Sequence, residues 1–244
     1  MSWQYRGLFR NLIKCKITVK GNVIRIDGWQ KKEGKDLKVC EKKEIVKKGY
    51  DRLAERYQTI RRAFDNKREL NEFASLLPKN AKVLDVGCGA GVPVAQFLVD
   101  SGFDVTGIDF SKNMLELARK NVPNAKFLVK DMTTLDFEAD SFDGLTAFYS
   151  IIHVSREKHF SLFQSFHRIL KPQGIMLVCL GPDEWEATDN YYGTEMFWSQ
   201  YSPEKSLQLL KKAGFEIISD NVLVRGGERH YWILTRNKKH IINK

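Results

Sequence analysis

The sequence has no hydrophobic run of the ~18 residues that a membrane-spanning helix requires. Its first ten residues also lack the long apolar stretch and small-residue cleavage site of a secretory leader, so we expect a cytoplasmic protein. Cysteine is scarce, and the four cysteines include no Cys-x-x-Cys pair, which argues against structural zinc and disulfides. Asp140 and Asp143 lie on either side of a predicted turn rather than at metal-ligand spacing, and we expect no bound metal.

Positive charge is concentrated near the N-terminus. Residues 1–48 contain 14 Lys and Arg but only 5 Asp and Glu, whereas the rest of the chain is nearly balanced. Such a segment is attracted to nucleic acid, anionic lipid or an acidic protein, but it is also typical of a solvated extension without a partner. Within it, residues 17–26 predict a β-hairpin that turns at a Gly-Asn pair. We therefore divide the chain into a basic extension, residues 1–41, and a main domain, residues 42–244.

The most informative motif begins with an apolar strand. Residues 83–86 (Val-Leu-Asp-Val) are followed by glycines at alternate positions, Gly87, Gly89 and Gly91. Glycine permits positive φ and has no Cβ, so the backbone can pass close to a ligand at the end of a parallel strand. A second predicted strand ends at Asp109, 22 residues after Gly87, which suits a carboxylate that binds a ribose diol. The pattern therefore predicts a nucleoside ligand.

The details favour S-adenosylmethionine (SAM) over a dinucleotide. Val92 stands where the dinucleotide fingerprint requires its third glycine. Asp85 would place a carboxylate beside a pyrophosphate, whereas it suits a cofactor that carries an ammonium and a sulfonium group. Residues 84–91 resemble the glycine motif of class I SAM-dependent methyltransferases, and the resemblance extends in sequential order from about Gly49 to Arg236. It implies SAM as the cofactor.

Strands and helices alternate through the main domain, which predicts a doubly wound, mostly parallel sheet. The last two predicted strands, 215–224 and 229–236, are joined by a short turn, so one of them must run antiparallel. The resemblance implies the same seven-stranded, Rossmann-like α/β methyltransferase fold with an antiparallel final hairpin. An amphipathic helix at 42–59 precedes it. The other predicted strands are 82–86, 104–108, 126–130, 142–149 and 174–180, and the other helices are 92–101, 112–121, 156–170 and 203–213.

The resemblance also implies which residues contact the cofactor. In the family an N-terminal helix closes over the cofactor, and the amphipathic helix here carries Tyr50 and Tyr57 on one stripe, which is equally typical of plain packing. Asp131 and Met132 match positions that contact adenine, although Asp131 also fits an Asx turn. Met114 is expected either against the adenine or in the core. The predicted cofactor-binding residues are Tyr50, Tyr57, Asp85, Gly87, Cys88, Gly89, Asp109, Phe110, Met114, Asp131, Met132 and Tyr149.

The methyl acceptor is expected beyond the end of the strand at 142–149. His153 follows that strand and is a candidate general base, because an unperturbed imidazole titrates near neutral pH; alternatively, it fixes the loop through a backbone hydrogen bond. Residues 182–202 form a long, irregular, aromatic-rich insertion, which predicts a lid or binding wall, or else a packing patch or an oligomer contact. The predicted substrate-contacting residues are His153, Tyr191, Tyr192 and Trp198.

The sequence as a whole predicts methyl transfer from SAM to an O, C or N nucleophile of a small molecule. Transfer is an in-line displacement, in which positioning contributes most of the acceleration. The alternatives are an RNA or protein methyltransferase that uses the basic N-terminus, and a SAM-binding protein without catalysis. The strand before His153 lacks the Asn/Asp-Pro-Pro-aromatic motif of amine-methylating relatives, which weighs against methylation of nucleic-acid bases. No particular acceptor or oligomeric state is indicated.

Overall fold

A computed structural model describes residues 16–20, 23–27, 38–61, 64, 66–225 and 227–239. The chain divides into two units, Met1–Asp36 and Leu37–Lys244. In the first, strand β1 (Lys16–Lys20) pairs antiparallel with β2 (Val23–Asp27), which confirms the predicted hairpin. The second unit begins before residue 42, because helix α1 (Val39–Arg61) already starts at Val39. The functional division into a basic extension and a methyltransferase domain stays a prediction.

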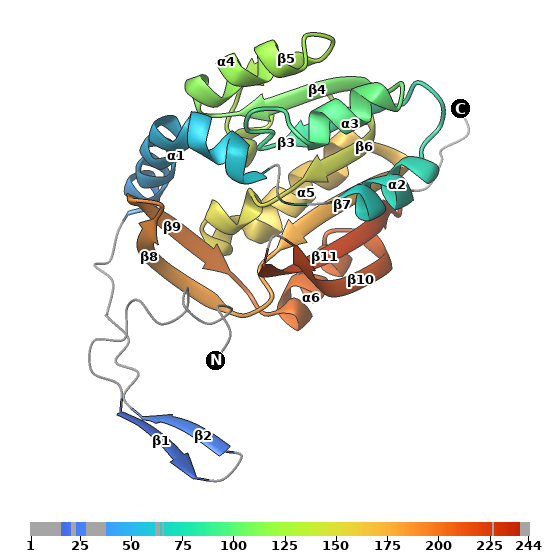
Figure 1. The fold of residues 1–244 in the computed structure, drawn as a ribbon. Helices are drawn as coiled ribbons and strands as arrows, with labels where there is room; N and C mark the ends of the chain where they lie inside the picture. Colours follow the sequence, from blue (N-terminus) through green and yellow to red (C-terminus); the bar gives the residue numbers. More distant parts are fainter. Residues whose placement is uncertain are drawn as a thin grey trace. The chain divides into compact units, whose positions relative to one another are not determined.

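The second unit contains a seven-stranded sheet in the order β10-β11-β7-β6-β3-β4-β5 (Figure 1). The five strands from β7 to β5 run parallel, whereas β11 is antiparallel to both β7 and β10. The predicted α/β fold with an antiparallel final hairpin is therefore confirmed. The strands are β3 (Lys82–Val86), β4 (Asp104–Asp109), β5 (Lys126–Val129), β6 (Phe142–Ala147), β7 (Leu170–Leu180), β10 (Phe215–Arg225) and β11 (Glu228–Asn237).

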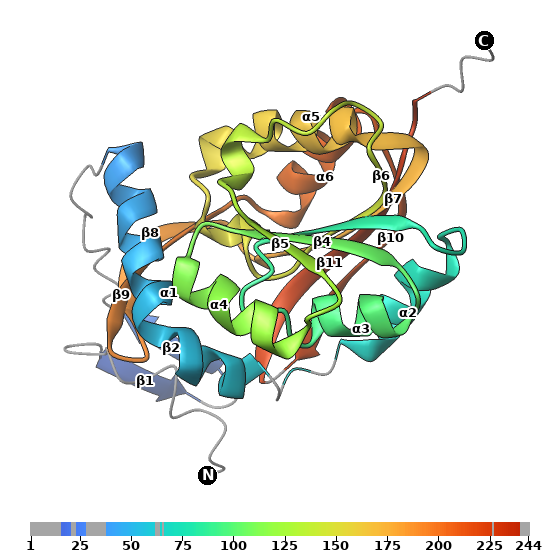
Figure 2. The same cartoon turned by 90° about the horizontal axis from the view of Figure 1, so that it is seen from above.

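Helices cover both faces of this sheet, as Figure 2 shows. Apolar side chains of α5, including Phe163 and Phe166, pack on one face together with α6. On the other face Phe73 of α2, Leu98 of α3 and Leu115 of α4 form the second half of the core. Both faces are thus buried, as a parallel sheet requires. The helices are α2 (Lys67–Ser75), α3 (Val94–Asp100), α4 (Lys112–Asn121), α5 (His159–Ile169) and α6 (Pro203–Lys212).

The aromatic segment at 182–202 is a β-hairpin, so the prediction of an irregular insertion was wrong. Strand β8 (Trp185–Tyr191) pairs antiparallel with β9 (Thr194–Gln200) through a two-residue turn. The turn residues Tyr192 and Gly193 both have positive φ, 51° and 91°. Two successive positive φ angles are typical of the tight hairpin turn whose twist matches the flanking strands. The tyrosine in this turn concealed the signal.

Helix α1 packs against β9 and α4, as both ribbon views show (Figures 1 and 2). Gly49 makes this approach possible, because a Cβ there would lie 2.4 Å from the sulfur of Met196 on β9. A glycine inside a helix costs about 1 kcal/mol relative to alanine. Here the close packing of helix on hairpin offsets that cost. The contact fixes the position of Tyr50, the next residue of α1.

The segment after β6 bends sharply away from the sheet. The strand ends at Ala147 rather than at the predicted residue 149, and Tyr149 adopts a positive φ of 55°. A short 3-10 helix, Ile151–His153, follows. A non-glycine residue in this conformation is strained, and such strain is common at functional sites. The bend brings His153 toward α1 and β9.

Candidate active site

The glycine loop lies between β3 and α3, next to the end of β6. Gly87 has a φ of 71°, and a Cβ there would lie 2.3 Å from the Cβ of Ser150. The amides of Gly87 and Cys88 both donate to the carbonyl of Ile108 on β4, at 2.8 and 3.0 Å. The loop is therefore held close to two neighbouring strand ends, and only glycine fits at position 87.

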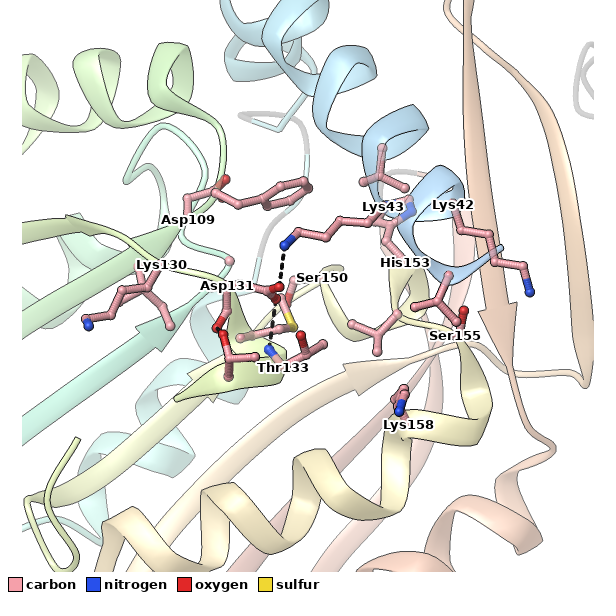
Figure 3. A pocket seen from close by; sticks show the side chains of 18 of the residues that line it. Lys42, Lys43, Asp109, Lys130, Asp131, Thr133, Ser150, His153, Ser155 and Lys158 are labelled. Carbon is pink, nitrogen blue, oxygen red and sulfur yellow. Dashed lines mark hydrogen bonds and ion pairs between the residues drawn. The ribbon is translucent and has the colours of Figure 1, made fainter. Parts of the chain in front are cut away.

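A cavity of about 250 Å³ opens at the carboxyl ends of the parallel strands (Figure 3). We call it the strand-end cavity. In open α/β sheets ligands bind at this edge, where the direction of strand order reverses, and β3 is the reversal point here. The predicted residues that line it are Gly87, Asp109, Phe110, Asp131, Met132 and His153.

Asp109 is buried at the end of β4. Its two carboxylate oxygens accept hydrogen bonds from the amide of Gly89, at 3.0 Å, and of Ser111, at 2.8 Å. Burial raises the pKa of Asp109 to about 6, although these backbone donors oppose the rise. The carboxylate therefore ties the glycine loop to β4 while its side chain faces the cavity.

Asp85 is 2% exposed and carries an orphaned oxygen. Its Oδ1 accepts a hydrogen bond from Thr146 at 2.8 Å, but Oδ2 has no partner in the structure. Burial raises the pKa of this carboxyl to about 7. A buried acid with a free acceptor is complementary to a cationic donor such as the ammonium group of SAM. Together with the glycine loop and Asp109, it fits that cofactor.

Asp131 forms an Asx turn, which is the alternative that the sequence predicts for this residue. Its Oδ1 accepts from the amide of Thr133 at 2.9 Å, and its Oδ2 pairs with Lys43 of α1, as Figure 3 shows. Burial alone would raise the pKa of Asp131, but the bonds from Lys43 and Thr133 outweigh it and hold the pKa below its usual value. Lys43 thus joins α1 to the rim of the strand-end cavity. Contact of Asp131 with adenine stays a prediction.

His153 makes two hydrogen bonds. Nδ1 lies 2.7 Å from the carbonyl of Phe197 on β9, and Nε2 lies 2.7 Å from the hydroxyl of Tyr50. Because a carbonyl only accepts, Nδ1 carries the proton, and Nε2 accepts from Tyr50. Burial lowers the pKa of His153 to about 4. The ring is therefore neutral at physiological pH, with both nitrogens engaged.

A second cavity, of about 170 Å³, lies between α1, the bend after β6, the β8–β9 hairpin and β11. We call it the hairpin cavity. Several residues that the sequence predicts to contact the cofactor or the acceptor line it: Tyr50, Tyr57, Tyr149, Tyr191 and Trp198. His153 lines both cavities. The hairpin cavity is also lined by Arg61, Glu228 and His230, which were not predicted from the sequence as site residues. Arg61 lies one helical turn after Tyr57 on the stripe that carries Tyr50 and Tyr57, so helical periodicity could have predicted it. No pattern in the sequence points to His230.

Several predicted residues line neither cavity. Met114 is 1% exposed and packs against Ala54 and Ala90, which is the core alternative. Tyr192 is 42% exposed at the hairpin turn, under the guanidinium of Arg56. Cys88 and Gly89 belong to the glycine loop itself. No group of three metal-ligating side chains occurs among the described residues, and within that part of the chain no helix is long and apolar enough to cross a membrane.

The fold and the strand-end cavity define the class of protein: they are those of SAM-dependent methyltransferases. One solved structure with this fold is Burkholderia thailandensis 1,6-didemethyltoxoflavin-N1-methyltransferase, with bound 1,6-didemethyltoxoflavin and S-adenosylhomocysteine (SAH). It matches with a TM-score of 0.65 and 17% identity, over 83% of this chain and 92% of that one. Residues 83–174 match the model of the methyltransferase domain family. The predicted class, fold and cofactor class are confirmed.

Two curated relatives are similar over more than half of this chain. Sterol 24-C-methyltransferase of Debaryomyces hansenii is 30% identical over 159 residues, which cover 57% of this chain and 41% of the relative. Phosphoethanolamine N-methyltransferase 1 of Arabidopsis thaliana is 32% identical over 164 residues, which cover 63% of this chain and 32% of the relative. The chain thus spans less than half the length of these two relatives.

Proposed function

We propose that the protein transfers the methyl group of SAM to an O, C or N atom of a small molecule held in the hairpin cavity. The observation that carries this proposal is that His153 lines both cavities. A nucleoside at the strand ends and an acceptor beneath the hairpin would meet beside this residue. The names of the curated relatives, which refer to a sterol and to phosphoethanolamine, support a small-molecule acceptor.

Asp109 in the strand-end cavity, the buried Asp85, which lines neither cavity, and Tyr57 of the hairpin cavity would hold the cofactor. Asp109 would accept from the ribose hydroxyls, and the free oxygen of Asp85 would receive the ammonium group. SAM, when bound, supplies a methyl group on a positively charged sulfur. Tyr57 lies beside the glycine loop, where a Cβ on Gly89 would be 4.0 Å from its ring, and its π face suits a cation.

Catalysis would depend mainly on positioning. In-line displacement requires the nucleophile about 3–3.5 Å from the reacting carbon, and holding it there supplies several kcal/mol of the acceleration. Tyr50 and His153 are hydrogen-bonded to each other and His153 to β9, so the position of His153 beside both cavities is fixed. The neutral ring of His153 has its acceptor nitrogen occupied by the Tyr50 hydroxyl. We therefore assign His153 a positioning role; where the methyl acceptor must lose a proton, that proton would pass to solvent water.

A direct test separates the cofactor from the acceptor. Calorimetric titration should give binding of SAM and SAH but not of NAD or NADP. Labelled SAM should then transfer its methyl group to a metabolite extract and not to total RNA or protein from the same cells. Binding of NAD in place of SAH would contradict the cofactor assignment.

A second candidate is an RNA substrate, favoured by the lysines around the strand-end cavity. Lys42, Lys43, Lys130 and Lys158 all line it. Three of them pair with carboxylates: Lys42 with Glu186, Lys43 with Asp131 and Lys130 with Asp136. This pairing reduces the field available to a polyanion. Label recovered in RNA would support the second candidate over the first.

A further inference from the structure

Arg61, the last residue of α1, is a buried charged side chain in the wall of the hairpin cavity. It is 7% exposed, and aromatic rings cover its planar faces. Its guanidinium carbon lies 3.4 Å from the ring centroid of Tyr149 and 4.1 Å from that of Phe64. Stacking of this kind compensates only part of the charge, because it leaves the N–H edge of the guanidinium available for hydrogen bonds.

No carboxylate among the described residues pairs with Arg61. The acid in the same cavity, Glu228, instead lies 3.4 Å from Nε2 of His230. An arginine stays charged even when it is buried, and a buried charge without a counter-ion is strongly unfavourable. The guanidinium edge therefore lacks the anion that would neutralise it.

His230 provides a second, independent polar group at the same place. The side chain is 6% exposed, it lines the hairpin cavity, and its Nδ1 has no hydrogen-bond partner. Its ring contacts the edge of Tyr149 with centroids 4.5 Å apart, and Arg61 stacks on the same tyrosine. Two incompletely satisfied polar side chains on separate elements, α1 and β11, thus converge on Tyr149.

Much of the remaining lining of the hairpin cavity is aromatic. Trp185 and Trp198 stack with centroids 5.6 Å apart, and Tyr191 meets Trp198 edge-on. The volume of about 170 Å³ is close to that of an engineered cavity of about 150 Å³ that holds benzene. The cavity therefore suits a planar molecule of about one ring with one charged substituent.

We propose that Arg61 binds a carboxylate carried by the methyl acceptor, with the ring of His230 beside it, so that the acceptor is a small planar acid. This inference rests on the proposed function. A carboxylate is also present on the amino-acid end of SAM, which is the other possible source. The location favours the acceptor, because Arg61 and His230 line only the hairpin cavity, whereas Gly87 and Asp109 line only the strand-end cavity.

The experiment uses the full-length protein saturated with SAH, and benzoate and benzamide as probes. These two molecules share one ring and nearly one shape but differ in charge. Wild-type protein should bind benzoate at least tenfold more tightly than benzamide. Arg61→Gln should remove this preference, and Arg61→Lys should retain part of it. Arg56→Gln is the matched control, because Arg56 is an exposed arginine on the same helix that lines neither cavity.

Two results would overturn the inference. The first is equal affinity of the wild-type protein for benzoate and benzamide, which needs no variant and is unaffected if Arg61→Gln does not fold. The second is that Arg61→Gln weakens SAH tenfold but leaves the affinity for decarboxylated SAH unchanged, which would assign Arg61 to the cofactor's own carboxylate. Failure of wild-type protein to bind SAH would instead contradict the proposed function, so that titration is performed first.

Discussion

The strand-end cavity and the hairpin cavity meet at His153, but they are assembled in different ways. The first takes most of its lining from the segments that follow β3, β4, β5 and β6, so most of its residues are fixed by local motifs, although Lys42 and Lys43 of α1 also line it. The second takes Arg61 from α1, Trp198 from β9 and His230 from β11, which are far apart in the sequence. The cofactor edge of the proposed site therefore follows mainly from local turns, while its proposed acceptor side depends on elements distant in sequence.

The buried ionisable side chains of the two cavities also differ, although four lysines line the first cavity and Glu228 lines the second. Asp85 and Asp109 place buried carboxyl groups at or beside the strand-end cavity, and both have raised pKa values because of burial. The hairpin cavity presents Arg61 and His230 instead. A cation is complementary to the first arrangement and an anion to the second. We therefore expect substitutions in one cavity to leave ligand binding in the other largely unchanged.

The largest effect is expected for Gly87→Ala. The added methyl group would collide with Ser150 at 2.3 Å in a backbone that already has a φ of 71°. We expect SAH affinity to fall by more than about 100-fold, the equivalent of about 3 kcal/mol. Gly102→Ala is the matched control, because Gly102 has a φ of 82° but no atom within 4 Å of its Cβ position. The control should lose only about 1 kcal/mol of stability. Calorimetry of both variants provides the comparison.

Asp109→Ala should weaken SAH by roughly 10- to 100-fold, since a hydrogen bond to a charged group contributes about 1.5–3 kcal/mol. The hairpin cavity does not include Asp109, so benzoate binding at saturating SAH should persist. Asp104→Ala, an exposed acid on the same strand, is the control. Unchanged SAH affinity in a well-folded Asp109→Ala protein would show that this carboxylate serves only the glycine loop.

Asp85→Asn should make stability less dependent on pH. The raised pKa means that the native state holds this proton more tightly than the unfolded chain, so stability is lost as pH rises from about 4 to about 7. The neutral amide avoids this cost, and the variant should be more stable by on the order of 2–4 kcal/mol at pH 8 and nearly unchanged at pH 4. Urea denaturation at the two pH values measures the difference. Because the carboxylate is lost, SAH should bind less tightly. A variant that is no more stable at pH 8 and binds SAH as tightly as the wild type would contradict the role of the orphaned oxygen.

His153→Asn should alter the transfer rate by less than about tenfold, whereas removal of a general base would lower it by about 10²–10⁴-fold. Tyr50→Phe removes only the partner hydroxyl and should have an effect of similar size, with each variant losing about 1 kcal/mol of stability. The measurement is transfer of label from SAM to the acceptor pool between pH 6 and 9. A rate loss above about 100-fold for His153→Asn alone would restore the general-base assignment.

Removal of residues 1–36 should have the smallest effect on either cavity, because every residue that lines them belongs to the second unit. SAH affinity should stay within about twofold of the full chain, a difference below about 0.5 kcal/mol. Retention on heparin, measured against salt, should fall because residues 1–36 contain 9 Lys and Arg against 3 Asp and Glu, a net charge of +6 out of +10 for the chain. Equal retention of the two proteins would assign polyanion binding to the lysines of the main domain.

Local motifs explain how much of the site could be predicted. Gly87, Asp109 and Asp131 each lie at or just after the end of a strand, so recognising the strand also located the residue at the ligand-binding edge. The β8–β9 hairpin was missed because Tyr192 occupies a turn position where asparagine or glycine is the usual signal. Arg61 was missed because its burial depends on Phe64 and Tyr149, one beyond the helix and the other in a distant loop.

The sequence by itself determined the class of fold, the glycine loop and the acids at the strand ends, since these follow from short-range periodicity and from backbone conformations that few residues tolerate. Only the tertiary structure decided which side chains line the hairpin cavity, where we propose that the acceptor binds. The tertiary structure brings Tyr50 to His153, 103 positions away in sequence, so that both imidazole nitrogens are hydrogen-bonded. It also brings Arg61 and His230 into contact with Tyr149. The physical reason is that contacts between distant segments are selected by packing of the whole domain, which no local pattern encodes.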